Sequence, residues 1–244
     1  MEKDFQEKYH RLEKSHWWFR ARRDMILRLA KEKKRTISIL DMGCSGCPLL
    51  RTLKKDGFKN LQGIDSSQEA VRACREQGFD NVSRMSAENT EFPKNSFDLL
   101  ISSDLLEHIE DDCAALREWN RILKPGGIMI VFVPAFRFLW SRHDEINRHF
   151  RRYSRKELME KLGHSGFSVE RASYWNFCLF LPALSLKCIQ RLFSKKGSDQ
   201  LFGLPPLLNT LLLWMLKAEN FFLEHLDLPF GVSVFAVARK STSN

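Results

Sequence analysis

The stretch Ile37-Ser38-Ile39-Leu40-Asp41-Met42-Gly43-Cys44-Ser45-Gly46 predicts a buried strand that ends on an acid and opens into a glycine-bearing turn. Residues 61–65 (Leu-Gln-Gly-Ile-Asp) repeat this pattern and also end on an acid, Asp65. In an open parallel sheet, ligands bind outside the carboxyl ends of the strands. A small turn lets a ligand approach the backbone, and an acid on the next strand can accept hydrogen bonds from ribose hydroxyls. The two strand ends therefore predict a site for a nucleoside cofactor.

Beyond residue 36, short apolar runs alternate with amphipathic stretches. Strands are predicted at 37–41, 61–65, 81–85, 97–102, 127–133, 167–174 and 231–239, and helices at 47–56, 67–77, 111–123 and 154–164. Strands that alternate with helices indicate βαβ units and a mostly parallel sheet with helices on both faces. The pattern predicts an α/β fold, a Rossmann-like, doubly wound sheet of seven strands. The last two strands can pair as an antiparallel edge.

The chain divides into four predicted segments. Residues 1–35 form an N-terminal helical cap, and residues 36–175 form the cofactor-binding core. Residues 176–229 form a hydrophobic helical insertion, and residues 230–244 hold the last core strand and the tail. With 244 residues, 43% of them hydrophobic and 28% charged, the chain has the composition of a globular protein with a sizeable core.

The net charge of +9 is concentrated toward the N-terminus, in residues 1–35. A basic surface attracts nucleic acid, anionic lipid or an acidic substrate. Nucleic acid is the disfavoured partner, because acidic residues are interspersed throughout and no run resembles an arginine-rich arm. The highly charged N-terminus lacks the apolar core of a signal peptide, which favours a cytoplasmic location.

The six cysteines are scattered along the sequence. Cys44 and Cys47 have the spacing of a redox or metal pair, but they lie in the strand-to-helix turn and no second pair lies at zinc-ligand distance. We therefore expect reduced cysteines, as in most cytoplasmic proteins.

The turn after the first strand discriminates between cofactors. A nicotinamide fold requires G-x-G-x-x-G, whereas the sequence from Gly43 reads Gly-Cys-Ser-Gly-Cys-Pro and lacks the second and third glycines. A dinucleotide is thus disfavoured. A P-loop is excluded, because no G-K-[ST] follows the turn.

Five motifs within residues 37–135 occur in one characteristic order. They are Asp41-Met42-Gly43-Cys44-Ser45-Gly46-Cys47, then Asp65, then Ser86-Ala87-Glu88 with Phe92-Pro93, then Phe97–Asp104 with Leu106-Glu107-His108-Ile109, and finally Leu123-Lys124-Pro125-Gly126-Gly127. This series resembles the class I S-adenosylmethionine-dependent methyltransferases. The first motif departs from the family's Gly-x-Gly-x-Gly, because Ser45 and Cys47 stand at the later glycine positions.

The outer parts of the sequence resemble a methyltransferase type 11/12-like bacterial subgroup. The N-terminal signature is His16-Trp17-Trp18-Phe19, followed by Arg20, Arg22 and Arg23. The second region is Trp140, His143-Asp144-Glu145, His149 and residues 151–154.

The resemblance implies S-adenosylmethionine as cofactor and S-adenosylhomocysteine as product, with no metal. The implied cofactor-binding residues are Asp41, Gly43, Cys44, Ser45, Gly46, Asp65, Ser66, Ala87, Glu88 and Ser103. Asp65 would hold the ribose hydroxyls through charge-assisted hydrogen bonds. Strand-end acids also cap helices or turns, which is the structural alternative for each of them.

Candidate acid/base residues are the histidines His108, His143 and His149, because a histidine titrates near neutrality. Each could instead hold a loop or belong to an ion-pair network. Candidate substrate-binding residues are Trp17, Trp18, Trp140, Arg151 and Arg152. Trp17, Trp18 and Phe19 could form a lid over the pocket or anchor the first helix on the sheet. The arginines could bind an anionic acceptor group or form a solvated charged face.

The insertion at 176–229 is apolar but contains no run long enough to span a bilayer. Apolar helices flanked by cations are typical of interfacial membrane elements. Peripheral contact with the inner face of the membrane is one reading, and internal packing or a homodimer interface is the other.

We expect methyl transfer to oxygen or nitrogen of an unidentified acceptor, which could be hydrophobic or lipid-linked, or else a small polar metabolite. The altered glycines keep open a non-catalytic, methyltransferase-like binding module. A nicotinamide oxidoreductase is the third class considered.

Overall fold

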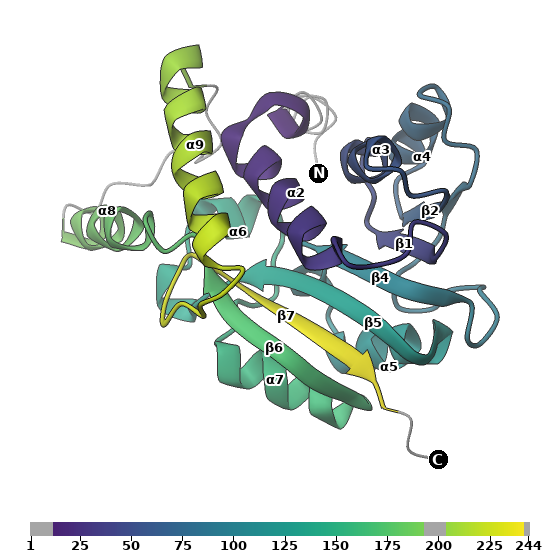
Figure 1. Cartoon of the computed structure of the whole chain (residues 1–244). Coiled ribbons are helices and arrows are strands. Elements are labelled where there is room, and N and C mark those ends of the chain that lie inside the picture. The colour runs from purple at the N-terminus through teal and green to yellow at the C-terminus, as the bar shows by residue number, and fades with distance from the viewer. Residues whose placement is uncertain (1–11, 193–203, 242–244) are drawn as a thin grey trace.

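The computed structural model describes residues 12–192 and 204–241, so parts of the predicted cap (1–35), insertion (176–229) and tail (230–244) lie outside the described residues. Its centre is a seven-stranded sheet in the order β3-β2-β1-β4-β5-β7-β6 (Figure 1). The strands are β1 Ser38–Met42, β2 Asn60–Asp65, β3 Val82–Arg84, β4 Phe97–Ser103, β5 Leu123–Pro134, β6 Phe167–Trp175 and β7 Ser233–Lys240. This confirms the predicted seven-stranded, Rossmann-like sheet.

The sheet has a parallel half and an antiparallel half. Strands β3, β2, β1, β4 and β5 pair in parallel, whereas β7 pairs antiparallel with both β5 and β6. The carboxyl ends of β1 and β4 lie side by side, with Met42 opposite Ser102. The order reverses beside β1, and a ligand crevice forms at such a reversal in open α/β sheets.

Helices cover both faces of the sheet. The helices are α2 Trp17–Ala30, α3 Pro48–Lys55, α4 Gln68–Arg75, α5 Asp112–Ile122, α6 Arg142–Ile146, α7 Arg155–His164, α8 Phe180–Leu192 and α9 Pro206–Phe222, with short 3₁₀ helices η1 Leu106–His108 and η2 Arg137–Leu139. Helices α3, α4, α5 and α7 match the predicted positions to within two residues. Ser67, Asp111 and Ser154 start three of them, because each side chain accepts a hydrogen bond from a backbone amide three residues later.

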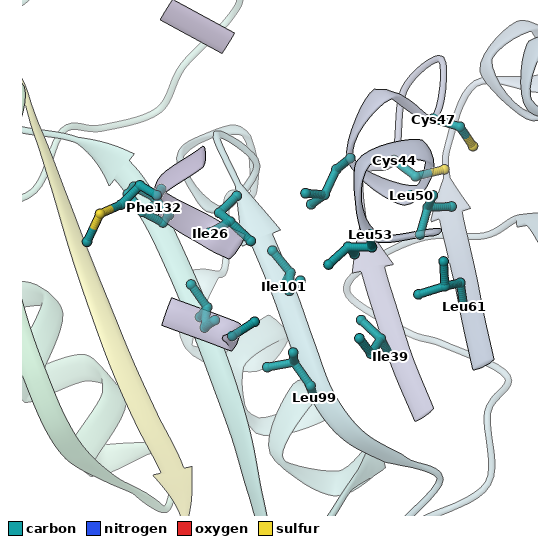
Figure 2. Packing of buried hydrophobic residues seen from close by; sticks show 14 of the residues in the cluster. Ile26, Ile39, Cys44, Cys47, Leu50, Leu53, Leu61, Leu99, Ile101 and Phe132 are labelled. Carbon is teal, nitrogen blue, oxygen red and sulfur yellow. The ribbon is translucent and has the colours of Figure 1, made fainter. Parts of the chain in front are cut away.

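Each face of the sheet has its own hydrophobic core. On one face, residues such as Ile39, Leu99, Ile101 and Phe132 of the strands pack beneath α2, α3, α4 and α9. Figure 2 shows part of this cluster, with Ile26 of α2 over Phe132 and Leu50 and Leu53 of α3 over the β1 and β2 side chains. On the other face, Leu40, Leu100 and Met129 pack on α5 and α7. Strands buried on both faces explain their near-continuous apolar sequences.

Two cysteines of the first core are joined. Cys47 and Cys74 form a disulfide with a Cα–Cα distance of 5.4 Å, which ties the start of α3 to α4. The expectation of reduced cysteines is thus wrong for this pair. Nothing in the sequence indicates this pair, because Cys74 lies 27 residues from Cys47 and only the packing of α4 against the turn brings the two together. Cys44, Cys113, Cys178 and Cys188 are free.

Helices α2 and α9 lie side by side although they are far apart in the sequence (Figure 1). Asn220 of α9, which is fully buried, joins them. Its amide nitrogen donates to the Ala21 carbonyl (2.9 Å) and to Asp24 Oδ2 (2.9 Å), and its Oδ1 accepts from the indole of Trp175 (2.8 Å). One side chain therefore links α9, α2 and β6.

We expect Asn220→Ala to destabilise the protein, because it leaves the buried indole N–H of Trp175 without its hydrogen-bond partner. A buried donor without a partner costs about 1–3 kcal/mol of unfolding free energy. Guanidinium denaturation measures this loss as a lower transition midpoint, with an unchanged slope of unfolding free energy against denaturant concentration. Thr210→Ala on the exposed side of α9 is the control and should change stability by less than about 0.5 kcal/mol. Wild-type stability in Asn220→Ala would contradict the docking of α9 on α2.

Candidate functional site

A pocket lies at the carboxyl ends of β1 and β4, between those strands and α2. The lining residues are Glu13, Phe19, Arg22, Arg23, Ile26, Asp41, Gly43, Cys44, Pro48, Leu49, Ser103 and Asp104. The pocket thus occupies the edge that the sequence predicts, and it contains Asp41, Gly43, Cys44 and Ser103 from the predicted set.

The turn after β1 forms the floor of the pocket. Gly43 has a φ of +74°, which a glycine adopts without strain, and a Cβ there would lie 3.2 Å from Leu105. The amides of Gly43 and Cys44 both donate to the Ile64 carbonyl at the end of β2, at 2.9 and 3.0 Å. The turn therefore folds back over β2. Gly63 leaves room for the Cys44 side chain there, because a Cβ at position 63 would lie 2.9 Å from the Cys44 sulfur.

Asp65 fixes the geometry of this turn. Its Oδ2 accepts from the Ser45 amide and its Oδ1 from the Ser67 amide, each at 2.9 Å. Ser45 has a positive φ of 48°, so the carboxylate stabilises a conformation that a serine rarely adopts. The structural role foreseen for a strand-end acid is therefore real at Asp65.

Three carboxylates approach one another around Asp41. Asp41 is only 4% exposed, and its burial raises its pKa to about 8, with further contributions from Glu13 and Asp65. Glu13 reaches this cluster from the segment before α2 and accepts a hydrogen bond from Ser45 Oγ at 2.6 Å. Such a concentration of acidic groups favours a cationic ligand in the pocket.

Arg22 closes the other side of the pocket. Its guanidinium is buried, donates to Asp104 Oδ2 at 2.7 Å and to Ser103 Oγ at 3.1 Å, and reaches Ser233 of β7. The same group lies over the rings of Trp175 and Phe132, 4.4 and 4.8 Å from their centroids. The N-terminal helix is thereby held to β4, β5, β6 and β7 at once.

A second polar cluster follows β4, next to the pocket. His108 of η1 lies against His149, with ring centroids 4.5 Å apart and the rings nearly perpendicular. His149 Nδ1 lies 2.9 Å from Asp144 Oδ1, and Arg152 binds both oxygens of Asp144 at 2.8 and 2.9 Å. The Phe150 amide donates to the Glu107 carbonyl at 2.8 Å, which joins the two chain segments.

The electrostatics of this second cluster differ from the prediction of bases that titrate near neutrality. Desolvation and the neighbouring His149 lower the pKa of His108 to about 4, and the same causes lower the pKa of His143. Although burial opposes it, hydrogen bonds from His149 and Arg152 hold the pKa of Asp144 well below its ordinary value. His108 and His143 are therefore neutral at pH 7, and His108 is a weak base.

The structure distributes the other predicted residues as follows. Ala87 and Glu88 lie in the loop after β3, where the Ala87 carbonyl accepts from the buried Trp119 indole at 2.8 Å and Glu88 is exposed. Gly46 accepts through its carbonyl from Gln77 at 3.1 Å, and Ser66 accepts similarly from Arg84 at 3.1 Å. Six residues of the predicted cofactor set do not line the pocket as the described residues form it: Ser45, Gly46, Asp65, Ser66, Ala87 and Glu88.

The predicted substrate-binding residues have mainly structural contacts. Trp17, the first residue of α2, is buried in the core. Trp18 contacts Trp175 edge-on, with ring centroids 5.3 Å apart. Their neighbour Phe19 lines the pocket. Arg151 pairs with Asp112 at 2.9 Å and Arg152 pairs with Asp144. The half-buried Trp140 follows η2.

Several site residues are absent from the prediction. Glu13, Arg22, Arg23 and Ile26 reach the pocket from the N-terminal segment, and nothing in their spacing indicates where that segment packs. Phe19, by contrast, is a predicted candidate for covering the pocket, and it lines the pocket. Glu107 is the other omission. It directly precedes His108 in a recognised motif, and that adjacency is the one signal that could have found it.

Comparisons with known proteins agree with this geometry. Residues 40–131 match the family model described as a methyltransferase domain. The chain is 28% identical over 166 residues to the probable S-adenosylmethionine-dependent methyltransferase of Mycolicibacterium smegmatis, covering 65% of this chain and 62% of that protein. It is 31% identical over 101 residues to the ubiquinone biosynthesis O-methyltransferase of Caulobacter vibrioides, covering 39% and 40%. The match thus spans about two fifths to three fifths of these relatives.

A solved structure shows the same fold. One chain of the complex that contains the Haloferax volcanii Trm112 methyltransferase activator superposes with a TM-score of 0.66 at 20% identity, covering 99% of this chain and 96% of that one. The family match covers the predicted cofactor motifs from Leu40 to Val131. Relatives of this kind use S-adenosylmethionine as methyl donor. Residues 40–131 are therefore similar to a methyltransferase domain, and the sheet that carries them has the fold of this solved neighbour.

Proposed function

We propose that this protein transfers the methyl group of S-adenosylmethionine to a hydroxyl or amine of a hydrophobic acceptor at a membrane surface. The observation that carries the cofactor part is the pocket at the ends of β1 and β4 with the buried carboxylate of Asp41 in its wall. The α-ammonium and sulfonium of the cofactor are cationic, and both suit a pocket where Asp41, Glu13 and Asp65 gather. The residues present therefore fit the cofactor.

The cofactor supplies an activated methyl group on a sulfonium. In the transfer, the bond from methyl carbon to sulfur breaks as the bond from acceptor oxygen or nitrogen to carbon forms, and the sulfur keeps the electron pair. The acceptor's proton must leave, and the polar cluster of His108, His143 and His149 is where this chain can take it up. Among them, His149 has the best-defined partner, because Asp144 accepts from its Nδ1 at 2.9 Å and orients the ring.

The acceptor class is inferred from helices α8 and α9. Their exposed side chains include Leu181, Leu186, Ile189, Leu207, Leu211, Trp214, Phe221 and Phe222, and Leu207 is 84% exposed. None of the helices in ranges 12–192 and 204–241 has the length and apolarity to cross a bilayer. Exposed apolar helices of this kind suit contact with lipid in the interfacial plane. The Caulobacter relative is named for ubiquinone biosynthesis, and ubiquinone is a lipid-soluble quinone. That name supports a phenolic or quinol acceptor.

Asp65→Ala should weaken S-adenosylmethionine binding by at least about 100-fold, because two charge-assisted hydrogen bonds to ribose contribute about 1.5–3 kcal/mol each. Calorimetry with S-adenosylmethionine measures the affinity, with NADH as the negative titrant. Transfer of labelled methyl to phenolic acceptors, with and without isoprenoid tails, then tests the reaction. Asp80→Ala, in an exposed position beyond α4, is the control and should keep full affinity. Unchanged affinity in a folded Asp65→Ala protein would contradict the cofactor site.

Asp41 generates a prediction about pH. Its pKa is raised from an ordinary 3.8 to about 8, so between those values the folded state holds a proton that the unfolded state releases. The free energy of unfolding should therefore fall as pH rises from 4 to 8, and this part of the slope should vanish in Asp41→Asn. A cationic cofactor lowers this pKa, so binding at pH 7 should release a proton. Calorimetry in two buffers of different ionisation enthalpy detects that release, and equal heats would contradict the role of Asp41.

The acceptor proposal is tested by flotation with vesicles. The protein should float with phosphatidylcholine vesicles that contain phosphatidylglycerol, because the basic chain adds electrostatic attraction to apolar contact. Leu211→Glu and Trp214→Glu, both on exposed α9 positions, should abolish flotation. Met159→Glu, an exposed apolar position on α7, is the matched control and should float normally. Failure to float with either neutral or anionic vesicles would remove the main support for a lipid-linked acceptor.

A further inference from the structure

Glu107 is the buried charged group that the proposed reaction does not use. It is 1% exposed, and neither carboxylate oxygen has a hydrogen-bond partner among the residues that the structure describes. A buried carboxylate without hydrogen bonds is costly, and such groups in native proteins are paired or coordinate a metal. The cations of its surroundings are committed elsewhere, because Arg22 pairs with Asp104 and Arg152 with Asp144.

Two histidines share the space that Glu107 faces. One carboxylate oxygen of Glu107, one ring nitrogen of His108 and one ring nitrogen of His149 all lie within 4.8 Å of one another. Glu107 and His108 come from η1 after β4, and His149 comes from the segment after α6. The exposed edge of His108 leaves the cluster open on one side, whereas Glu107 closes it from within.

The residues around the histidines orient them as the residues around a metal site orient its ligands. Asp144 accepts from His149 Nδ1, which leaves Nε2 as the nitrogen that can bind a metal. Asp144 is itself completely buried and fixed by the two bonds from Arg152 and by the Ser141 amide at 2.7 Å. A carboxylate that orients a histidine in this way is the usual outer shell of a metal site.

We propose that Glu107, His108 and His149 bind one divalent transition-metal ion, of the class of Zn²⁺, Mn²⁺, Fe²⁺ or Co²⁺. Two imidazoles and one carboxylate, without thiolate, are a ligand set that these ions accept with open positions for water or substrate. This step rests on the proposed function: the open positions of the ion would take the acceptor's oxygen and lower its pKa. Asp104, which lines the cofactor pocket, is three residues from Glu107 in the sequence. When the ion is bound, His108 and His149 are its ligands, and the uptake of the acceptor's proton assigned above to His149 passes to His143.

Titration with Co²⁺ tests the site, on the full chain freed of metal by chelation and kept under non-reducing conditions. One equivalent should bind, with weak visible bands and without a sulfur charge-transfer band. Glu107→Gln and His149→Gln should each weaken binding by at least about 100-fold, and Asp144→Asn by about 10- to 100-fold, as for outer-shell residues. The matched controls are Glu110→Gln, exposed three residues later, and His164→Gln, exposed at the end of α7; both should bind as wild type.

A second readout is independent of turnover. Zn²⁺ should raise the melting temperature of the wild type and not that of Glu107→Gln, because a ligand that binds only the folded state stabilises it. If Glu107→Gln does not fold, His108→Gln and His149→Gln carry the test. Absence of stoichiometric binding by Co²⁺, Zn²⁺ and Mn²⁺, unchanged affinity in the ligand variants, or a sulfur charge-transfer band would overturn the proposal.

The same preparations separate this inference from the proposed function. S-adenosylmethionine affinity should be unchanged in Glu107→Gln, since Glu107 does not line the cofactor pocket. Metal binding without cofactor binding would retain the site and reject the methyl transfer. Cofactor binding without metal binding would reject the metal site and retain the proposed methyl transfer.

Discussion

The buried guanidinium of Arg22 is the contact on which the arrangement of the molecule depends. It pairs with Asp104 at the end of β4, reaches Ser233 of β7 and lies over the rings of Phe132 and Trp175. Arginine suits this role because its planar, always charged group can bind a carboxylate and stack on aromatic rings together. Through it, α2 forms one wall of the pocket and also covers the antiparallel half of the sheet. Helix α9 depends on α2 in turn, through Asn220.

The pocket and the second polar cluster differ in how their charged groups are balanced. At the pocket, Glu13 and Asp65 gather around Asp41 on one side, and Arg22 on the other side is paired with Asp104, so the side around Asp41 suits a cationic ligand. In the second cluster, each cation is matched to a carboxylate, as in Arg152 with Asp144, and Glu107 is the exception. Asp41, whose pKa burial raises to about 8, and Glu107, whose buried carboxylate has no hydrogen-bond partner among the described residues, thus mark the two places where the proposals put ligands. The paired arginines, by contrast, belong to the fold.

The sequence predicted what depends on local patterns. Alternating apolar runs located all seven strands, and the acids at strand ends located Asp41 and Asp65. What it did not predict depends on contacts between distant segments. The packing of α2 and the segment before it puts Arg22 and Glu13 into the pocket, and the meeting of α3 with α4 joins Cys47 to Cys74. Burial of Glu107 depends on the segment around Phe150, which lies more than forty residues away, so the motif alone could not distinguish it from a surface acid.

The position of β7 between β5 and β6 has a consequence for how the chain acquires this fold. β5 and β6 do not pair with each other, and each completes its hydrogen bonding only on β7, which follows both in sequence. The parallel half can assemble from neighbouring βαβ units, whereas the antiparallel half must wait for a strand that closes a long loop. Such non-local pairing is slow, and it leaves open strand edges and the apolar helices α8 and α9 exposed meanwhile. Self-association during folding is therefore concentrated in this half of the molecule, away from the cofactor pocket's floor.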